Sequence, residues 1–361
     1  WSHPGGPKVE AAAAEFAAAA GGGEGDGKTA DADLLDLPYV VKGMDFSFSG
    51  ISSAANDAAD DGVPVEEICF SLQEHAFAML TEVSERALSL TGADELVLGG
   101  GVAQNDRLRE MLATMCEARG ADFFAPESRF LRDNAGMIAV LGAKMAAAGD
   151  TVPIAESAVD PNFRPDQVPV TWRDGESVAR TADGGTSAAD GGTSAGDAPA
   201  RDPDAPRRGA EATVTVTGSG DDRRVVKRRV EKSYRHPELD ETLRRDRTVA
   251  EARLTSEARR AGVPTPLVCD VDLATATLAL QHVGERDLAA ALDEGATEAV
   301  GRHLARLHDA GLVHGDPTTR NVRVSAAAGG DGESSGEARA SGGAEFDGGA
   351  APSTYLIDFG L

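Results

Sequence analysis

Residues 311–324, GLVHGDPTTRNVRV, place Asp316 five positions before Asn321, directly ahead of an apolar run. Kinase-type phosphoryl transfer needs a carboxylate at the attacking hydroxyl and an amide oxygen on a metal ion, both within one short loop between strands. Asp316 as catalytic residue and Asn321 as metal ligand meet that requirement. The alternative is a polar surface turn, since Asp, Asn, Gly and Pro are ordinary turn residues.

The last eight residues, TYLIDFGL, decide between these interpretations. A strand-like apolar run leads into Asp358, Phe359 and Gly360, which have the form of a metal-binding D-F-G element. Two such motifs in kinase order are much harder to obtain by chance than one. Asp358 is therefore predicted to be a second metal ligand of a kinase-type site.

The segments GAEATVTVTG and RRVVKRRV predict paired strands, with Lys227 at the position of the lysine that contacts phosphate. The helix-like segment ETLRRDRTVAEARLTSEARRAG offers Glu251 as the ion-pair partner of that lysine. One lysine on a strand is usually a solvated charge, but four roles in kinase order make this improbable. The glycine-rich loop is reduced to Gly209, so backbone amides and small side chains must make room for the ATP phosphates.

The motifs GAEATV, RTVAEARL, AGVPTP, VHGDPTTRN and LIDFGL together resemble the small atypical kinase/ATPase of the KEOPS complex, a relative of the RIO kinases. The resemblance covers residues 209–361 and implies a small bilobal protein-kinase-like domain, with an N-lobe over 209–283 and a partial C-lobe over 284–361. It also implies Mg²⁺ and ATP as ligands and other KEOPS subunits as partners. Pro317 departs from the family, which has leucine there. A small-molecule phosphotransferase of the aminoglycoside or choline kinase type is the alternative, because it uses a similar HGD loop.

Two low-complexity segments divide the chain. Residues 174–208 contain the near-repeat DGGTSA and almost no large apolar side chains, which predicts a flexible linker between 1–173 and 209–361. Residues 326–352 have a similar composition and lie between the catalytic loop and the D-F-G element. They are predicted to be an insertion in the hairpin that joins two strands, since lengthening a surface loop costs little entropy.

The first part of the chain predicts an α/β layer. Helix-like stretches VEEICFSLQEHAFAMLTEVSERALSL and RLREMLATMCEARG accompany the strand-like stretches ELVLGG and ADFFAP. Three glycines, 99–101, follow a strand and would let a nucleotide approach the backbone closely. Asp133 precedes a helix, where a plain N-cap role is an open alternative to a functional one.

HPGGPKVE, KGMDFSFSGISSA, ELVLGGGVAQNDRLREML and FLRDNAGMIAVLGAKM together resemble the C-terminal part of the universal tRNA threonylcarbamoyladenosine transferase, an actin-like ATPase (ASKHA) fold. For residues 1–173 the resemblance implies that Gly6, Glu10 and Asn105 bind threonylcarbamoyl-adenylate and that Asp133 is a ligand of a catalytic Fe²⁺ or Zn²⁺. The family's H-x-x-x-H pair has no counterpart among the seven histidines. We therefore expect an interior fragment of a transferase–kinase fusion.

The two resemblances together imply synthesis of threonylcarbamoyladenosine beside the anticodon of tRNAs that read ANN codons, with the kinase or ATPase as a switch. The competing class is a non-catalytic fragment that only binds partners. Segment 223–260 holds 13 basic and seven acidic residues, an excess of six positive charges within a chain of net charge −25. This segment either follows a tRNA backbone through phosphate contacts or forms salt bridges with its own seven acidic residues.

Composition adds bounds on environment. Only six of 35 basic residues are lysine, and the acidic excess is typical of a protein from a high-salt cytoplasm. Cys69, Cys116 and Cys269 lie far apart, which favours neither a disulfide framework nor a zinc site. No apolar run is long enough to span a bilayer and no signal peptide opens the chain, so we expect a soluble, cytoplasmic protein without a membrane partner.

Overall fold

The computed structural model describes residues 5–20, 33–131, 134–168, 170–172, 207–209, 211–325 and 353–359. The predicted insertion 326–352 and nearly all of the predicted linker 174–208 lie outside the described residues, as do Asp133 and Gly360. The chain forms two compact units. The larger comprises residues 1–98, 105–124 and 202–361, and the smaller comprises residues 99–104 and 125–201.

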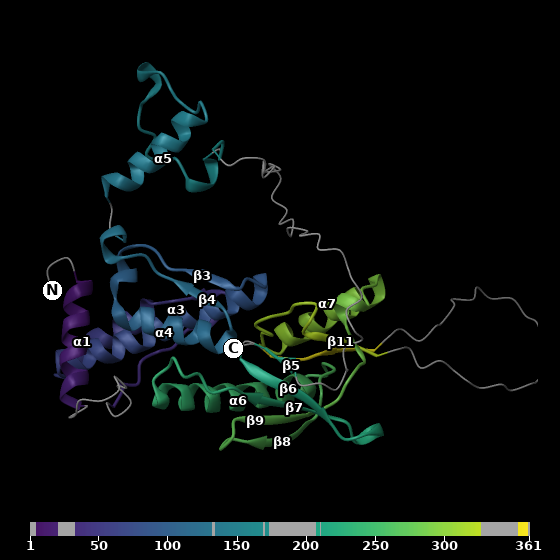
Figure 1. Ribbon diagram of the computed structural model, residues 1–361. Helices are drawn as coiled ribbons and strands as arrows, with labels where there is room; N and C mark the ends of the chain where they lie inside the picture. The colour runs from purple at the N-terminus through teal and green to yellow at the C-terminus, as the bar shows by residue number, and fades with distance from the viewer. Residues whose placement is uncertain are drawn as a thin grey trace, which may run out of the picture. The chain divides into compact units, whose positions relative to one another are not determined.

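Helix α3 (Val65–Thr91) is the centre of a helical layer in the larger unit. Helices α1 (Gly6–Ala20), α2 (Ser49–Asp60) and α4 (Asp106–Arg119) all pack against it (Figure 1). The two helices predicted for this part of the chain are therefore confirmed as α3 and α4. Helix α3 ends at Gly92, whose φ of 68° lies in the left-handed region that glycine adopts without a Cβ penalty.

Short strands flank this layer. Strand β3 (Glu95–Val97) pairs in parallel with β4 (Asp122–Phe124), and helix α4 connects them as in a β-α-β unit. Strands β1 (Val41–Lys42) and β2 (Asp45–Phe46) form a small antiparallel pair. The predicted order of strand, glycine turn, helix and strand is confirmed, and with it the mixed α/β class.

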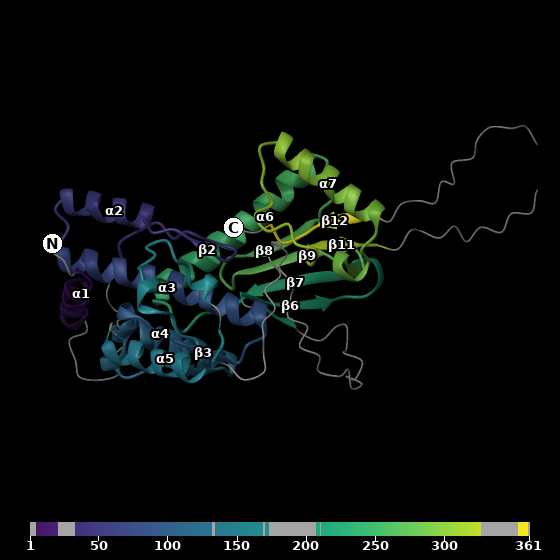
Figure 2. The ribbon, with the colours of Figure 1, turned by 90° about the horizontal axis from the view of Figure 1, so that it is seen from above.

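A five-stranded antiparallel sheet follows, in the order β5-β6-β7-β9-β8, with helix α6 (Pro237–Arg260) packed against it (Figures 1 and 2). The predicted strand pair is confirmed as β6 and β7, whose register joins Val214 to Lys227. The predicted helix is confirmed as α6. The strands are β5 (Arg207–Arg208), β6 (Ala212–Thr217), β7 (Arg224–Arg229), β8 (Val268–Asp272) and β9 (Thr277–Gln281).

A second, three-stranded sheet has the order β10-β11-β12, and helix α7 (Glu294–Asp309) lies against β12 (Figure 2). Its strands are β10 (Arg286–Asp287), β11 (Val322–Val324) and β12 (Thr354–Leu356). Strands β11 and β12 pair antiparallel, so the two motifs at the end of the chain sit on one hairpin. Its core includes Leu307, Val322, Leu356 and Phe359, each at most 2% exposed.

The smaller unit contains helix α5 (Ala135–Ala147), whose N-cap is Asn134. The Asn134 side chain accepts a hydrogen bond from the Met137 amide at 3.0 Å. The interpretation of Asp133 as this N-cap is therefore wrong by one residue. Short 3₁₀ turns complete the chain at Gly101–Gln104, Ser128–Phe130, Ile154–Glu156, Pro165–Gln167, Gly220–Asp222 and Leu288–Ala290.

Across the ranges that the structure describes, no helix combines the length and the apolar character needed to cross a membrane.

Candidate functional site

Strand β7 and helix α6 bring Lys227 and Glu251 together. Side chains two positions apart on a strand share a face, so Lys227 and Arg229 both point toward α6. The Lys227 ammonium lies 2.9 Å from Glu251 Oε1, and Arg229 Nη2 lies 2.8 Å from Oε2. Glu251 is only 1% exposed, and both of its carboxylate oxygens are held by cations.

Asp358 completes an ion triple. Its Oδ1 lies 2.6 Å from Lys227 Nζ, across 131 residues of sequence. Asp358 has φ of 56°, and Ala276 is the only other non-glycine residue with positive φ within the described ranges. Such backbone conformations are unfavourable for L-residues and concentrate at functional sites. The structure thus places the predicted strand lysine, its helix partner and the D-F-G aspartate at one point.

The charges of this triple reinforce one another. Burial acts to lower the pKa of Lys227, but Glu251 and Asp358 outweigh it and raise that pKa above its ordinary value. Burial likewise opposes ionisation of Asp358, but Lys227 lowers the pKa of the Asp358 carboxyl below its ordinary range. Lys227 is therefore cationic and Asp358 anionic at neutral pH, which is the charge pattern that phosphate and metal binding require.

The predicted catalytic loop, residues 314–321, meets the same end of the β11–β12 hairpin. Asn321 directly precedes β11, and its carbonyl accepts a hydrogen bond from the Ile357 amide, next to Asp358, at 3.0 Å. Asn321 Nδ2 donates to Asp316 Oδ2 at 2.9 Å and to the Asp316 carbonyl at 3.0 Å. The loop is thus a hydrogen-bonded turn that also fixes the exposed Asp316 carboxylate, so the turn interpretation and the functional one describe the same geometry.

Phe359 packs in the core next to Asp358. It is 2% exposed, and its ring stacks on the buried His314 ring with centroids 4.7 Å apart. Burial lowers the pKa of His314, so this ring is neutral at physiological pH. The stack joins the catalytic loop to the D-F-G element through the core.

Gly209 lies in the turn between β5 and β6, where its amide donates to the Ala212 carbonyl at 2.9 Å. A Cβ at this position would stand 3.4 Å from the same carbonyl oxygen, at the limit of ordinary van der Waals contact. The role of Gly209 in binding the ATP phosphates remains a prediction.

The site residues fit a magnesium–nucleotide ligand. Magnesium prefers hard oxygen ligands such as carboxylates and carbonyls. Asp358 supplies a half-exposed carboxylate, and Asn321, whose Nδ2 is bonded to Asp316, keeps its amide oxygen for a ligand. Among the residues with described positions, no group of three or more His, Cys, Asp or Glu side chains is arranged to hold a metal.

The residues predicted to bind the adenylate form a separate group. Glu10 and Asn105 are 95 positions apart, yet Glu10 Oε1 accepts a hydrogen bond from the amide of Asp106 at 3.4 Å. Gly6 begins helix α1 one turn before Glu10, on the same helix face. The structure therefore brings Glu10 to the start of helix α4, next to Asn105, with Gly6 one turn away on α1. Asp133 lies outside the described residues.

Asn105 also has a structural task. Its Oδ1 caps helix α4 by accepting from the amides of Arg107 and Leu108 at 3.0 and 3.2 Å, and its Nδ2 donates to Gln73 at 3.0 Å. Asn105 is nearly buried, at 9% exposure. A ligand at this position would therefore meet the Asn105 backbone and the rim of the helix more readily than its carboxamide.

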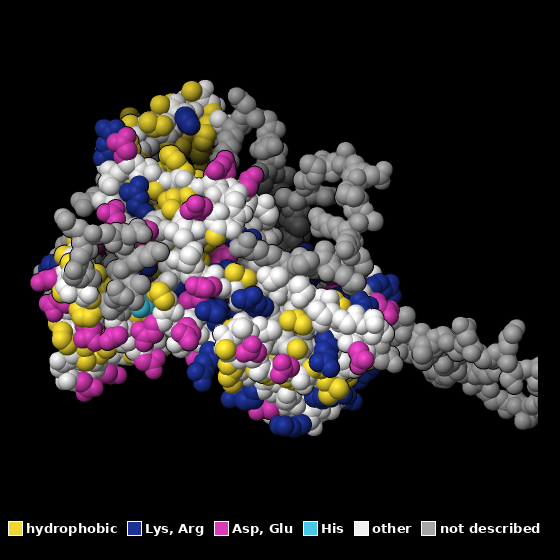
Figure 3. Space-filling view, turned by 60° about the horizontal axis from the view of Figure 1, so that its bottom comes forward, with side chains coloured by type: hydrophobic (Ala, Val, Ile, Leu, Met, Phe, Trp, Pro, Cys, Tyr) yellow, Lys and Arg dark blue, Asp and Glu magenta, His cyan; other side chains and the backbone are white. Residues whose placement is uncertain are grey.

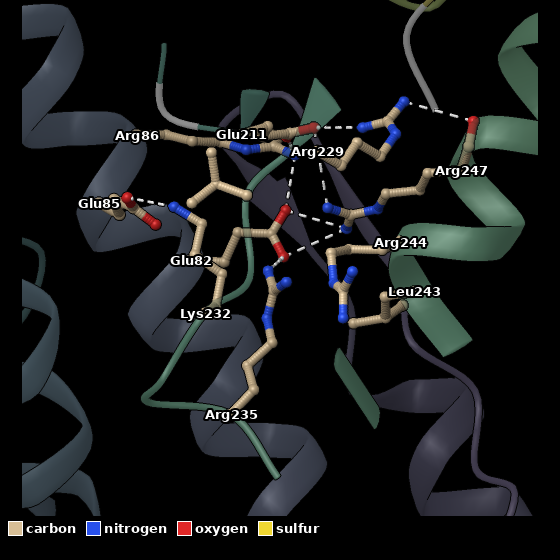
Figure 4. A pocket seen from close by; sticks show the side chains of 11 residues that line it. Glu82, Glu85, Arg86, Glu211, Arg229, Lys232, Arg235, Leu243, Arg244 and Arg247 are labelled. Carbon is tan, nitrogen blue, oxygen red and sulfur yellow. Dashed lines mark hydrogen bonds and ion pairs between the residues drawn. The ribbon is translucent and has the colours of Figure 1, made fainter. Parts of the chain in front are cut away.

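The sequence prediction missed an ion-pair network between helix α3 and the elements around α6 (Figure 4). Glu82 is at its centre: Arg235 lies 2.5 Å from Oε2, while Arg86 and Arg247 lie 2.6 and 2.9 Å from Oε1. Glu85, one turn along α3, pairs with Lys232 at 2.5 Å. This network is defined by Glu82, Glu85, Arg86, Glu211, Arg229, Lys232, Arg235, Asp240, Arg244 and Arg247.

The network resolves part of the question raised by the arginine-rich segment. Arg229, Arg235 and Arg247 are at most 8% exposed and all are paired with carboxylates. Salt bridges with acids of the segment are confirmed for Arg229 and Arg235, which pair with Glu251 and Asp240, whereas Arg247 pairs with Glu82 and Glu211 outside it. A phosphate-contacting role for these buried arginines is wrong. Other members of the segment, such as Arg228 and Arg245, are exposed, and Figure 3 shows basic and acidic side chains interspersed on one face.

Comparison with known proteins gives two matches. Residues 1–140 match the TsaD family, described as tRNA N6-adenosine threonylcarbamoyltransferase. Probable bifunctional tRNA threonylcarbamoyladenosine biosynthesis proteins are similar along the chain. Those of Halobacterium salinarum and Haloquadratum walsbyi are 59% and 58% identical, and each alignment covers 100% of this chain and 56% of the relative. The protein of Methanosarcina acetivorans is 42% identical, over 99% of this chain and 56% of the relative. The chain spans about half the length of these relatives.

Proposed function

We propose that this chain takes part in the formation of threonylcarbamoyladenosine in tRNA. The premise is that residues 1–140 match the TsaD family and that the chain is similar to probable bifunctional threonylcarbamoyladenosine biosynthesis proteins. In this proposal the group around Glu10 and Asn105 binds threonylcarbamoyl-adenylate. The threonylcarbamoyl group passes to the exocyclic nitrogen of the adenosine beside the anticodon, in tRNAs that read ANN codons, and AMP leaves. An Fe²⁺ or Zn²⁺ ion bound through Asp133 would polarise the transferred carbonyl.

For residues 209–361 we propose a protein-kinase-like domain that binds Mg-ATP and regulates the transferase, in an assembly with other KEOPS subunits. The observation that carries this proposal is the ion triple of Lys227, Glu251 and Asp358. Lys227 would bind phosphate oxygens while Glu251 holds its ammonium in place. Asp358 and Asn321 would hold Mg²⁺, which neutralises phosphate charge when bound.

Asp316 has the remaining role. Its carboxylate would accept the proton of the attacking group, which is a protein hydroxyl in a kinase and water in an ATPase. The hydrogen bond from Asn321 Nδ2 orients this carboxylate in the observed structure. The same geometry therefore supports phosphorylation of serine and hydrolysis of ATP.

Lys227→Met tests the ATP site. Removing the ammonium should lower ATP hydrolysis by the intact protein about 100-fold, because phosphate charge is then uncompensated during transfer. Lys232→Met is the matched control, since Lys232 is also a largely buried lysine paired with a glutamate. Steady-state ATPase rates of the three proteins decide the outcome. Equal rates in wild type and Lys227→Met would refute the proposal.

Glu10→Ala tests the adenylate site. Losing one charged hydrogen-bond partner should raise the KM for threonylcarbamoyl-adenylate roughly tenfold in a tRNA modification assay with the intact protein. Glu15→Ala is the control, because Glu15 is an exposed carboxylate on the same helix. If both variants modify tRNA as the wild type does, Glu10 does not bind the adenylate.

A further inference from the structure

Arg229 holds the Glu251 carboxylate from the side opposite Lys227. It is 7% exposed, and the roles assigned to the ATP site so far do not include it. Its Nη2 pairs with Glu251 Oε2 at 2.8 Å, while Lys227 pairs with Oε1 at 2.9 Å. A carboxylate held by a different cation at each oxygen cannot rotate without breaking one buried pair, so Arg229 fixes the direction in which Glu251 presents Oε1.

Arg229 also contacts a residue outside the ATP site. Its Nη1 lies 3.2 Å from Glu211 Oε2, at the start of strand β6. The other oxygen of Glu211 accepts a charged hydrogen bond from Arg86 on helix α3. Arg86 in turn lies 2.6 Å from Glu82 on the same helix.

These contacts form an uninterrupted relay of opposite charges from the helical layer to the ATP site. Glu82, Arg229 and Glu251 are at most 7% exposed, and in such a low-dielectric setting a displaced charge is costly. A shift of α3 would therefore be transmitted to the carboxylate that positions the phosphate-binding lysine. In order along the relay the residues are Glu82, Arg86, Glu211, Arg229, Glu251, Lys227 and Asp358.

We propose that Arg229 is a positioning residue of the ATP site and that, through Glu211 and Arg86, it makes the orientation of Glu251 depend on helix α3. The inference rests on the proposed ATP function and names how the TsaD-family segment would control it. In this proposal α3 affects the ATP site by reorienting the Glu251 carboxylate, without movement of a whole lobe of the kinase-like domain.

Arg229→Met in the intact protein is the first test. We expect the KM for ATP to rise about tenfold. Arg229→Lys keeps a cation near Glu251. Its KM for ATP should therefore rise by at most half as much as that of Arg229→Met, when both increases are expressed as logarithms. Arg235→Met is the matched control, since Arg235 is an equally buried arginine of the same network but pairs with Glu82 and Asp240. It should lower the melting temperature as Arg229→Met does, yet leave the KM for ATP within twofold.

The dependence on α3 is tested by a double-mutant cycle with Arg86→Met and Arg229→Met. Arg86→Met alone should raise the KM for ATP about threefold, although Arg86 lies on helix α3 in the TsaD-family segment. In the double variant the two effects should not multiply, because both changes break the same relay. Multiplicative effects, or no effect of Arg86→Met, would overturn the role of α3.

The outcomes separate this inference from the function on which it rests. If Lys227→Met hydrolyses ATP like the wild type, the ATP function itself is wrong. If Lys227→Met is inactive while Arg229→Met has the same KM for ATP as Arg235→Met, only the positioning role is wrong. If Arg229→Met does not fold, Arg229→Lys and Arg86→Met carry the test, and unchanged KM values in both would overturn the inference.

Discussion

Replacing Asp358 by alanine is expected to reduce the proposed ATP hydrolysis by the intact protein on the order of 1,000-fold, because it removes the proposed metal ligand and the partner of Lys227 together. In the structure Asp358 lies 2.6 Å from Lys227, in a backbone conformation that costs free energy to hold. Steady-state ATPase rates at saturating Mg²⁺ and ATP measure the effect.

Asp270→Ala is the control for Asp358→Ala. Asp270 is an exposed carboxylate on strand β8, in the same domain, so its loss removes one negative charge without touching the triple. Its ATPase rate should equal that of the wild type. Asp358→Asn should be nearly as inactive as Asp358→Ala, since an amide has the shape of the carboxylate without its charge. Rates of Asp358→Asn near that of the wild type would show that Asp358 does not bind the metal.

The parts of this protein that could be predicted from sequence are those in which local pattern and spacing determine the outcome. Alternation at β6 and β7 predicted paired strands, and helical periodicity predicted α3, α4 and α6 because burial of one face favours those elements wherever they pack. The order of Lys227, Glu251 and Asp358 predicted a shared site, and the structure brings the three together. Their catalytic and binding roles stay predictions.

The ion-pair network could not be predicted because its partners are far apart in sequence. The Arg235–Glu82 pair, for example, spans 153 residues, and no local rule selects a partner at such a distance. A signal was present in the form of Glu74, Glu82 and Glu85 on the buried face of helix α3, since three carboxylates on a buried face need cations. The arginine excess at 223–260 was the complementary half of that signal, but the salt bridges considered for it were with acids of the same segment and not with helix α3.

Asn105 shows a second limit, where one residue serves two purposes. The sequence resemblance assigned it to the adenylate, and its position before a helix also suits an N-cap. Both follow from the same location at the start of α4. Only the structure shows that its carboxamide is already bonded to two amides and to Gln73.

Glu82→Ala is expected to destabilise the protein by about 3–5 kcal/mol, since it leaves buried arginines without their shared carboxylate. Arg235 and Arg247, both at most 8% exposed, would then keep only Asp240 and Glu211, respectively, as carboxylate partners. Urea unfolding followed by circular dichroism at 222 nm measures the change. Glu110→Ala is the control, because Glu110 is an exposed partner of Arg107 and its loss should cost at most about 1 kcal/mol.

The pH dependence of the same experiment separates an electrostatic cause from lost packing. Burial acts to raise the pKa of Glu82, but Arg235, Arg247 and Arg86 outweigh it and hold that pKa below its ordinary value of 4.5. Burial opposes ionisation of Glu211 too, yet Arg247, Arg86 and Arg229 lower its pKa to about 2.

A carboxyl with a depressed folded-state pKa stabilises the protein fully above its unfolded pKa, and this contribution is lost as pH falls through the folded value. The stability advantage of wild type over Glu82→Ala should therefore be constant well above pH 4.5 and shrink as the pH falls below that value. An advantage that persists unchanged into acidic pH would mean that Glu82 acts through its packing and not through its charge.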